Sequence, residues 1–111
     1  MMQGKTITAL ILEDNANDML ILEKLIKSLK HKDIRFMAAA TLTEAIDILK
    51  KENFDLIISD LTLPDSRGLE TFRSLQSTSP KIPVILLTGV DDESIATQAV
   101  REGAQDYLIK G

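Results

Sequence analysis

The feature that most constrains the fold is a regular alternation between short apolar runs and amphipathic segments. Five runs are expected to be strands: residues 6–12, 34–38, 55–59, 84–88 and 105–110. Four segments with one apolar stripe separate these runs and are expected to be helices: about residues 17–29, a helix after Thr41, a helix after Gly68, and residues 91–102. The runs are continuous rather than alternating in hydrophobicity, which is typical of strands buried on both faces of a parallel sheet.

Strands that alternate with helices predict an α/β fold with right-handed crossovers, and these rules leave few topologies. We expect a doubly wound, five-stranded parallel sheet in the order 2-1-3-4-5, a flavodoxin-like three-layer sandwich. In that order the first helix covers one face and the next three helices cover the other. The chain stops at Gly111, directly after the fifth strand. We therefore expect a domain over residues 1–111 that is cut short before a fifth helix.

Length, charge and residue composition exclude several kinds of site and partner. The length of 111 residues suits one domain, and a net charge of -4 argues against nucleic acid as a direct partner. The absence of cysteine excludes disulfides, thiolate metal sites and a thiol nucleophile, and it fits a reducing cytosol, so a cytoplasmic location is expected. No apolar segment is long enough to span a membrane, so no membrane partner is expected.

Polar residues gather where the predicted strands end. Glu13 and Asp14 follow the first strand, Asp60 follows the third, Thr88 ends the fourth, and Lys110 ends the fifth. Adjacent strands lie about 4.8 Å apart, so these side chains should share one edge of the sheet. Taken alone, Asp60 could be a turn residue, a ligand for a cation, or a group that reacts.

The expected excess of carboxylates at this edge indicates a metal site. Two like charges about 4 Å apart repel by about 4 kcal/mol at an effective dielectric constant near 20, and one divalent cation would relieve that repulsion. Oxygen ligands without sulfur or imidazole favour Mg²⁺. We therefore predict that Asp60 is both a metal ligand and a nucleophile that forms an acyl phosphate. Lys110 and the Thr88 hydroxyl would stabilise the charge of the phosphoryl group.

Four pieces of the sequence carry a family resemblance: "LILEDN" (10–15), "LIISDLTLPDSRG" (56–68), "VILLTG" (84–89) and "DYLIKG" (106–111). In this order and spacing they resemble the receiver domain of two-component response regulators, over essentially the whole chain. One departure is Glu13, which stands where the family more often has aspartate. The second is the missing final helix.

The resemblance implies a role for each matching residue. Asp60 would be the phosphorylated aspartate, and Lys110 the essential lysine. Asp14 would bind Mg²⁺ directly, Glu13 through a water molecule, and Thr62 through its backbone carbonyl. Thr88 and Tyr107 would form a switch pair. The phosphoryl group would come from a histidine of a sensor kinase or phosphotransfer domain. The chain would then be a signalling domain rather than an enzyme, with an output domain or a second copy as further partners, and its helix 4–strand 5 face would carry the signal.

Several other classes of protein are less consistent with the sequence. The motifs of haloacid-dehalogenase and Toprim enzymes require a second aspartate two residues after the first. If Asp60 is the first aspartate, that second position is occupied by Thr62. A dinucleotide-binding protein should carry GxGxxG after its first strand, but "EDNAND" has no glycine. The remaining alternative is an interaction module with a receiver-like scaffold that works without phosphorylation.

Overall fold

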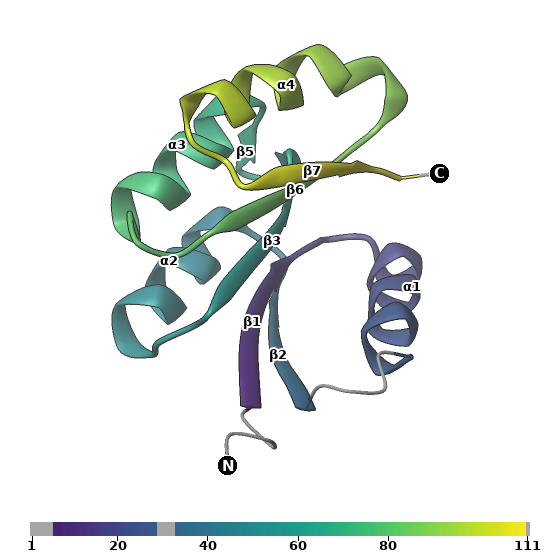
Figure 1. The fold of residues 1–111 in the computed structure, drawn as a ribbon, viewed down its shortest axis with the longest axis vertical. Coiled ribbons are helices and arrows are strands. Elements are labelled where there is room, and N and C mark those ends of the chain that lie inside the picture. The colour runs from purple at the N-terminus through teal and green to yellow at the C-terminus, as the bar shows by residue number, and fades with distance from the viewer. Residues whose placement is uncertain (1–5, 29–32, 111) are drawn as a thin grey trace.

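The structure is a computed structural model that describes residues 6–28 and 33–110 as one α/β domain (Figure 1). Its elements in chain order are β1 (Thr6–Leu12), α1 (Ala16–Lys27), β2 (Asp33–Ala39), α2 (Leu42–Lys51), β3 (Leu56–Asp60), β4 (Thr62–Leu63), β5 (Ser66–Arg67), α3 (Leu69–Thr78), β6 (Val84–Thr88), the 3₁₀ helix η1 (Val90–Asp92), α4 (Glu93–Glu102) and β7 (Asp106–Ile109).

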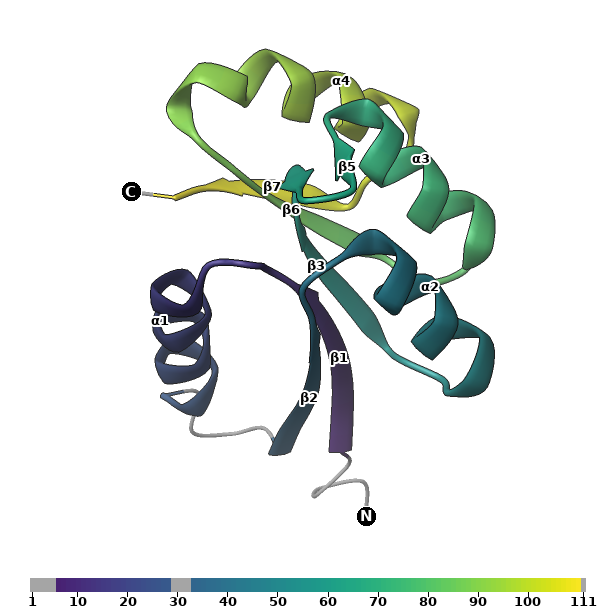
Figure 2. The ribbon, with the colours of Figure 1, turned by 180° about the vertical axis from the view of Figure 1, so that it is seen from behind.

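The main sheet is parallel throughout and has the order β2-β1-β3-β6-β7. Numbered among themselves, these five strands follow the predicted order 2-1-3-4-5, so the predicted topology is confirmed. Helix α1 lies on one face of the sheet, and α2, α3 and α4 lie on the other, as Figures 1 and 2 show from opposite sides. The carboxyl ends of the strands therefore meet at one edge, where the polar residues were expected.

The helices begin and end at residues with clear capping chemistry. The Asn15 side chain accepts a hydrogen bond from the backbone N–H of Asp18 at 3.0 Å and so caps α1. Helix α1 ends at Lys27, and residue 29 of the predicted helix lies outside the described residues. Gly103 ends α4 with a φ of 127°, a backbone conformation that glycine adopts without strain. None of the described helices is long and apolar enough to cross a membrane.

The hydrophobic core lies mainly between the sheet and helices α2, α3 and α4. Its largest fully buried side chains include Leu10, Ile57, Phe72, Leu75 and Leu86. Successive residues of a strand point to opposite faces, so the strand that sends Leu10 into this core sends its neighbours toward α1. Helix α1 itself contributes no buried residue.

An apolar groove runs between α1 and the β6–β7 side of the sheet. Its apolar lining comprises Ile21, Leu22, Leu25, Leu87, Leu108 and Ile109. Leu25 and Leu108 remain more than half exposed, at 60% and 54%. The face of the sheet beside α1 is thus only partly covered within the described residues.

The structure differs from the sequence prediction after β3. Residues 62–67, to which the sequence analysis assigned neither strand nor helix, form a short antiparallel hairpin in which Thr62 pairs with Arg67. Asp60 belongs to β3 instead of following it, and η1 precedes α4 where one helix over residues 91–102 was expected. Each arm of the hairpin has two residues, which is too short to produce a recognisable alternation in the sequence.

Candidate functional site

Three acidic side chains converge at the carboxyl edge of the sheet. Glu13 directly follows β1, Asp60 ends β3, and the two strands are in register with Leu12 opposite Ser59. One carboxylate oxygen from each of Glu13, Asp14 and Asp60 lies within 4.8 Å of the others. Glu13 and Asp60 are buried, whereas Asp14 is exposed. The fold therefore places the predicted acid cluster in one small region.

Lys110 reaches the same region from the end of β7. Its backbone N–H donates to the Thr88 carbonyl at 2.7 Å, which places the residue at the edge of the sheet. Its Nζ donates to Asp60 Oδ2 at 2.7 Å, to Asp18 Oδ2 at 2.9 Å and to Glu13 Oε1 at 3.1 Å. Partial burial pulls the pKa of Lys110 down, but the hydrogen bonds to these carboxylates outweigh it and hold the pKa above its usual value.

The environment of Glu13 also shifts its pKa upward, which for a carboxyl group favours the neutral form. Burial raises the pKa of the Glu13 carboxyl, although hydrogen bonds from the Asn15 N–H and from Lys110 partly offset this effect. The negative charge of Asp60 adds to the increase in the pKa of Glu13. A further cation beside Glu13 would therefore favour its ionised form.

Short hydrogen bonds fix the chain that follows Asp60. The Thr62 N–H donates to Asp60 Oδ1 at 3.1 Å, so each carboxylate oxygen of Asp60 has a donor. The Leu61 carbonyl accepts from the Gly68 N–H at 2.7 Å and from the Thr71 hydroxyl at 3.1 Å. The β4–β5 hairpin is thereby folded back toward the start of α3.

Asp65, for which the sequence pattern indicated no role, ties the tip of this hairpin to α2. Its carboxylate accepts from the backbone N–H groups of Leu42 at 2.8 Å and Thr43 at 2.9 Å, and from the Thr43 hydroxyl at 2.8 Å. The hydrogen bonds from Leu42 and Thr43 lower the pKa of Asp65. Because the first N–H groups of a helix lack partners within the helix, Asp65 supplies a remote cap and anchors the loop beside Asp60.

An open cleft lies over the acid cluster. Its lining comprises Glu13, Asp14, Asn15, Asp18, Asp60, Thr62, Leu63, Pro64, Arg67 and Lys110. Most of the predicted site residues are in this set. The lining, as far as the described chain defines it, does not include Thr88 or Tyr107.

The predicted switch pair instead makes hydrogen bonds away from the cleft. The Thr88 hydroxyl is buried and donates to the Gly89 carbonyl at 3.1 Å. The Tyr107 hydroxyl donates to Glu93 Oε2 on α4 at 2.6 Å, and this hydrogen bond raises the pKa of Tyr107. The two residues lie on neighbouring strands, where Tyr107 pairs with Leu86, two positions before Thr88.

Sequence reasoning missed two charged residues of the cleft, Asp18 and Arg67. Asp18 lies in the first turn of α1, where an acid is ordinary because it complements the helix dipole. Its position four residues after Asp14, close to the end of the first strand, was the available signal. Arg67 reaches the cleft because β5 folds back beside β4. The local sequence pattern does not predict this pairing.

The donor set fits a hard divalent cation. The cluster offers only carboxylate oxygens, which Mg²⁺ prefers as ligands, and one oxygen from each residue lies close enough to the others to share one ion. The exposure of Asp14 leaves room for water ligands, which Mg²⁺ retains when it binds proteins. Glu13, Asp14 and Asp60 could thus hold one such ion while the cleft stays open.

The doubly wound sheet, with acids and a lysine gathered at its carboxyl edge, defines a flavodoxin-like domain of the receiver class. The chain belongs to the response regulator receiver domain family, whose family model matches residues 9–111. It is therefore a signalling domain by family.

Similar proteins and structures agree with this assignment. The chain is 35% identical over 102 residues to the response regulator protein PilR of Pseudomonas aeruginosa, which is 92% of this chain and 22% of that protein. It is 28% identical to the transcriptional regulatory protein ZraR of Klebsiella oxytoca, over 98% of this chain and 24% of that protein. The chain thus spans about a quarter of the length of these relatives.

Two solved structures show the same fold. A response regulator receiver domain protein from Clostridium thermocellum superposes with a TM-score of 0.81 at 26% identity, covering 94% of this chain and 82% of that one. The signal receiver domain of an HD domain-containing protein from Pseudomonas fluorescens gives a TM-score of 0.76 at 27% identity, covering 93% and 74%. The predicted flavodoxin-like receiver fold is confirmed.

Proposed function

We propose that this domain takes a phosphoryl group onto Asp60 from a phosphohistidine of a sensor kinase or phosphotransfer domain, with Mg²⁺ bound by the acid cluster. The observation that carries the proposal is the position of the Lys110 ammonium, 2.7 Å from Asp60 Oδ2 and beside carboxylates that can share a cation. A reactive carboxylate, a fixed positive charge and a metal-capable cluster are the components that phosphoryl transfer requires.

In this mechanism one carboxylate oxygen of Asp60 attacks phosphorus. The new O–P bond forms as the P–N bond to the donor imidazole breaks, and the electron pair of that bond returns to the imidazole nitrogen. The Thr62 N–H and the Lys110 ammonium hold the two oxygens of Asp60 in place before attack. When bound, Mg²⁺ neutralises negative charge on the carboxylates and on the phosphoryl oxygens. By family resemblance, Asp14 would contact the ion directly, Glu13 through water, and Thr62 through its carbonyl.

Thr88 and Tyr107 would form the switch. The Thr88 hydroxyl, which now donates to Gly89, would turn toward a phosphoryl oxygen, and Tyr107 would move inward. That movement requires the hydrogen bond between Tyr107 and Glu93 to break. Because Glu93 starts α4, the change would alter the α4–β7 surface, which corresponds to the predicted helix 4–strand 5 face. An output domain or a second copy of the chain would bind there.

The alternative is a receiver-like interaction module that works without phosphorylation. Both proposals use the same fold, so the difference between them is whether Asp60 is phosphorylated. The ion pair between Lys110 and Asp60 favours the phosphoacceptor, because a scaffold used only for docking has no need for a lysine bonded to several buried or half-buried acids.

Acetyl phosphate labelling tests the proposal. The chain, incubated with acetyl phosphate and Mg²⁺, should gain the mass of one phosphoryl group, and hydroxylamine should remove it because acyl phosphates react with this nucleophile. Chelation of the metal should prevent the gain. A folded chain that binds Mg²⁺ but takes up no phosphoryl group would instead favour the interaction module.

The Mg²⁺ affinity should fall as the pH is lowered, and the fall should begin at a higher pH than the ordinary titration of a glutamate would give. Burial raises the pKa of Glu13, so this carboxyl takes up a proton at a higher pH than an ordinary glutamate and then no longer attracts a cation. Isothermal titration calorimetry at several pH values measures the effect. A Glu13→Gln variant should bind Mg²⁺ more weakly and show a flatter pH dependence. Equal pH dependence in both proteins would contradict the assignment to Glu13.

A further inference from the structure

Asp18, the third acceptor of the Lys110 ammonium, has no role in the proposed phosphoryl transfer. An ammonium group has three N–H donors, and those of Lys110 reach Asp60, Glu13 and Asp18. The first two acids belong to the metal-capable cluster, whereas Asp18 does not. The lysine is therefore shared between the reacting acids and an acid on a separate element, the first turn of α1.

We propose that Asp18 is a positioning residue for Lys110: its carboxylate holds the ammonium at the cleft so that one N–H remains directed at the phosphoryl-accepting oxygen of Asp60. The proposal rests on the function proposed above and adds a residue to it. Asp18 contacts neither Asp60 nor Glu13 in the described hydrogen bonds, so it would act only through the lysine.

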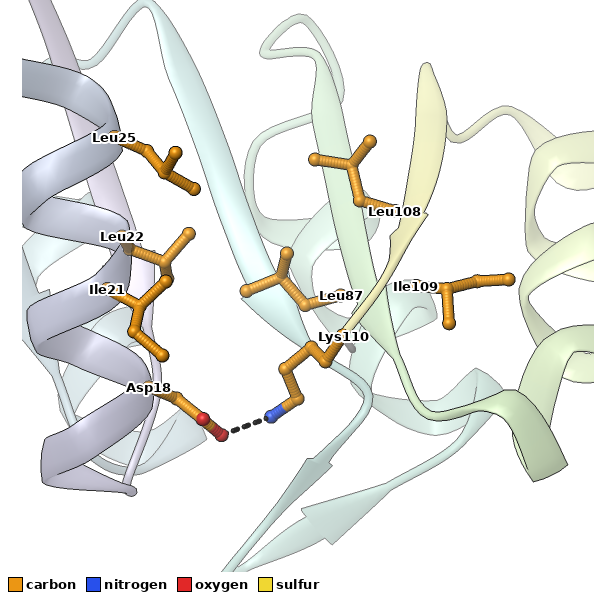
Figure 3. Close-up of a pocket in the computed structure, with 8 residues that line it drawn as sticks. All are labelled: Asp18, Ile21, Leu22, Leu25, Leu87, Leu108, Ile109 and Lys110. Carbon is orange, nitrogen blue, oxygen red and sulfur yellow. Dashed lines mark hydrogen bonds and ion pairs between the residues drawn. The ribbon is translucent and has the colours of Figure 1, made fainter. Parts of the chain in front are cut away.

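The surroundings of Lys110 explain why such an anchor is needed. Figure 3 shows Asp18 and Lys110 facing each other at one end of the apolar groove, with Ile21 and Leu87 close by. The side chain of Lys110 is 29% exposed. Among the described helices, α1 lies on this face of the sheet, and Asp18 in its first turn contacts the lysine. Without Asp18 the ammonium could turn toward water, because water would be the remaining partner for its third donor.

The contact should also survive occupation of the metal cluster. A cation bound by Glu13 and Asp60 draws on the same oxygens that Lys110 uses. The Asp18 carboxylate lies outside that cluster and keeps its full capacity to accept from the lysine. The backbone N–H of Asp18 is already bonded to Asn15, so a change of the side chain leaves the cap of α1 in place.

The test compares Asp18→Asn with Asp18→Ala, which remove the same charge. The asparagine carbonyl can still accept from the ammonium, but alanine cannot. We expect Asp18→Ala to lower the rate of acetyl phosphate labelling about tenfold, the size expected for one charge-assisted hydrogen bond, and Asp18→Asn to stay within about threefold of the parent. Because the charge loss is matched, both variants should bind Mg²⁺ with equal affinity. Equal rates in the two variants, whether fast or slow, would overturn the positioning role.

A second measurement does not depend on phosphorylation. The ammonium hydrogens of Lys110, observed by nitrogen-15 NMR in the metal-free protein, should exchange with water faster in Asp18→Ala than in the parent or in Asp18→Asn. Unchanged exchange would refute the contact itself. If the parent takes up no phosphoryl group, the proposed function fails, and the exchange measurement still decides whether Asp18 holds the lysine. The side chain of Asp18 is 33% exposed, so both variants should fold.

Discussion

An Asp60→Asn variant will gain no phosphoryl group from acetyl phosphate under conditions that label the parent completely. The amide keeps the size of the carboxylate and its carbonyl can still accept from the Thr62 N–H, but it lacks the anionic oxygen that attacks phosphorus. The fold should be retained. The variant carries one negative charge fewer beside Glu13 and Asp14 but also loses the ion pair with Lys110, so its unfolding temperature should stay close to that of the parent. Intact-protein mass spectrometry and thermal unfolding measure the two effects.

Asp47→Asn provides a matched control for this experiment. Asp47 is an exposed acid on α2, so the substitution makes the same chemical change outside the acid cluster. It should label at the parent rate. Residual labelling of Asp60→Asn at the parent rate would place the phosphorylated residue elsewhere and would remove the basis of the proposed function.

A Lys110→Ala variant will separate metal binding from phosphoryl transfer. We expect the labelling rate to fall about 10²- to 10³-fold, the loss that follows removal of one preorganised charge-stabilising donor. Mg²⁺ should bind at least as tightly as in the parent, because the substitution removes a positive charge that is hydrogen-bonded to Glu13 and Asp60. Labelling at saturating Mg²⁺ and calorimetric titration measure the two quantities separately.

The stability of the Lys110→Ala variant gives an independent check. Without the ammonium, the acids that it bridges repel one another across short distances. Added Mg²⁺ should therefore raise the thermal unfolding temperature of the variant more than that of the parent. If the labelling rate of the variant fell only in proportion to its Mg²⁺ occupancy, Lys110 would affect labelling through metal binding alone and would have no separate role in phosphoryl transfer.

Much of the fold could be predicted because its determinants are local. The apolar run of residues 6–12 and the helix expected after Thr41 each depend on a few consecutive positions, and both appear in the structure. The Thr41 hydroxyl oxygen caps that helix by accepting from the Glu44 N–H. Crossover rules then converted the order of these elements into the order of the strands. The convergence of Glu13, Asp14, Asp60 and Lys110 followed from that order, because parallel strands end at one edge.

The missed features depend on contacts between distant parts of the chain. The Asp65 bonds to α2 join residues 22 and 23 positions apart, and they exist because the β4–β5 hairpin folds back. The bond between Tyr107 and Glu93 depends on how α4 packs beside β7, which strand and helix periodicity do not specify. For the same reason the sequence did not place Arg67 and Asp18 in the cleft.

The sequence by itself determined the strand order and the strand-end side chains Glu13, Asp14, Asp60 and Lys110 that meet at the carboxyl edge, because periodicity and chain connectivity act over neighbouring residues. The tertiary structure alone decided which of these side chains hydrogen-bond to one another. Lys110 and Asp18 are 92 positions apart, and their contact depends on the placement of α1 against the sheet. The physical reason is that a hydrogen bond needs its two groups within about 3 Å, and no local pattern sets a distance between distant segments to that accuracy.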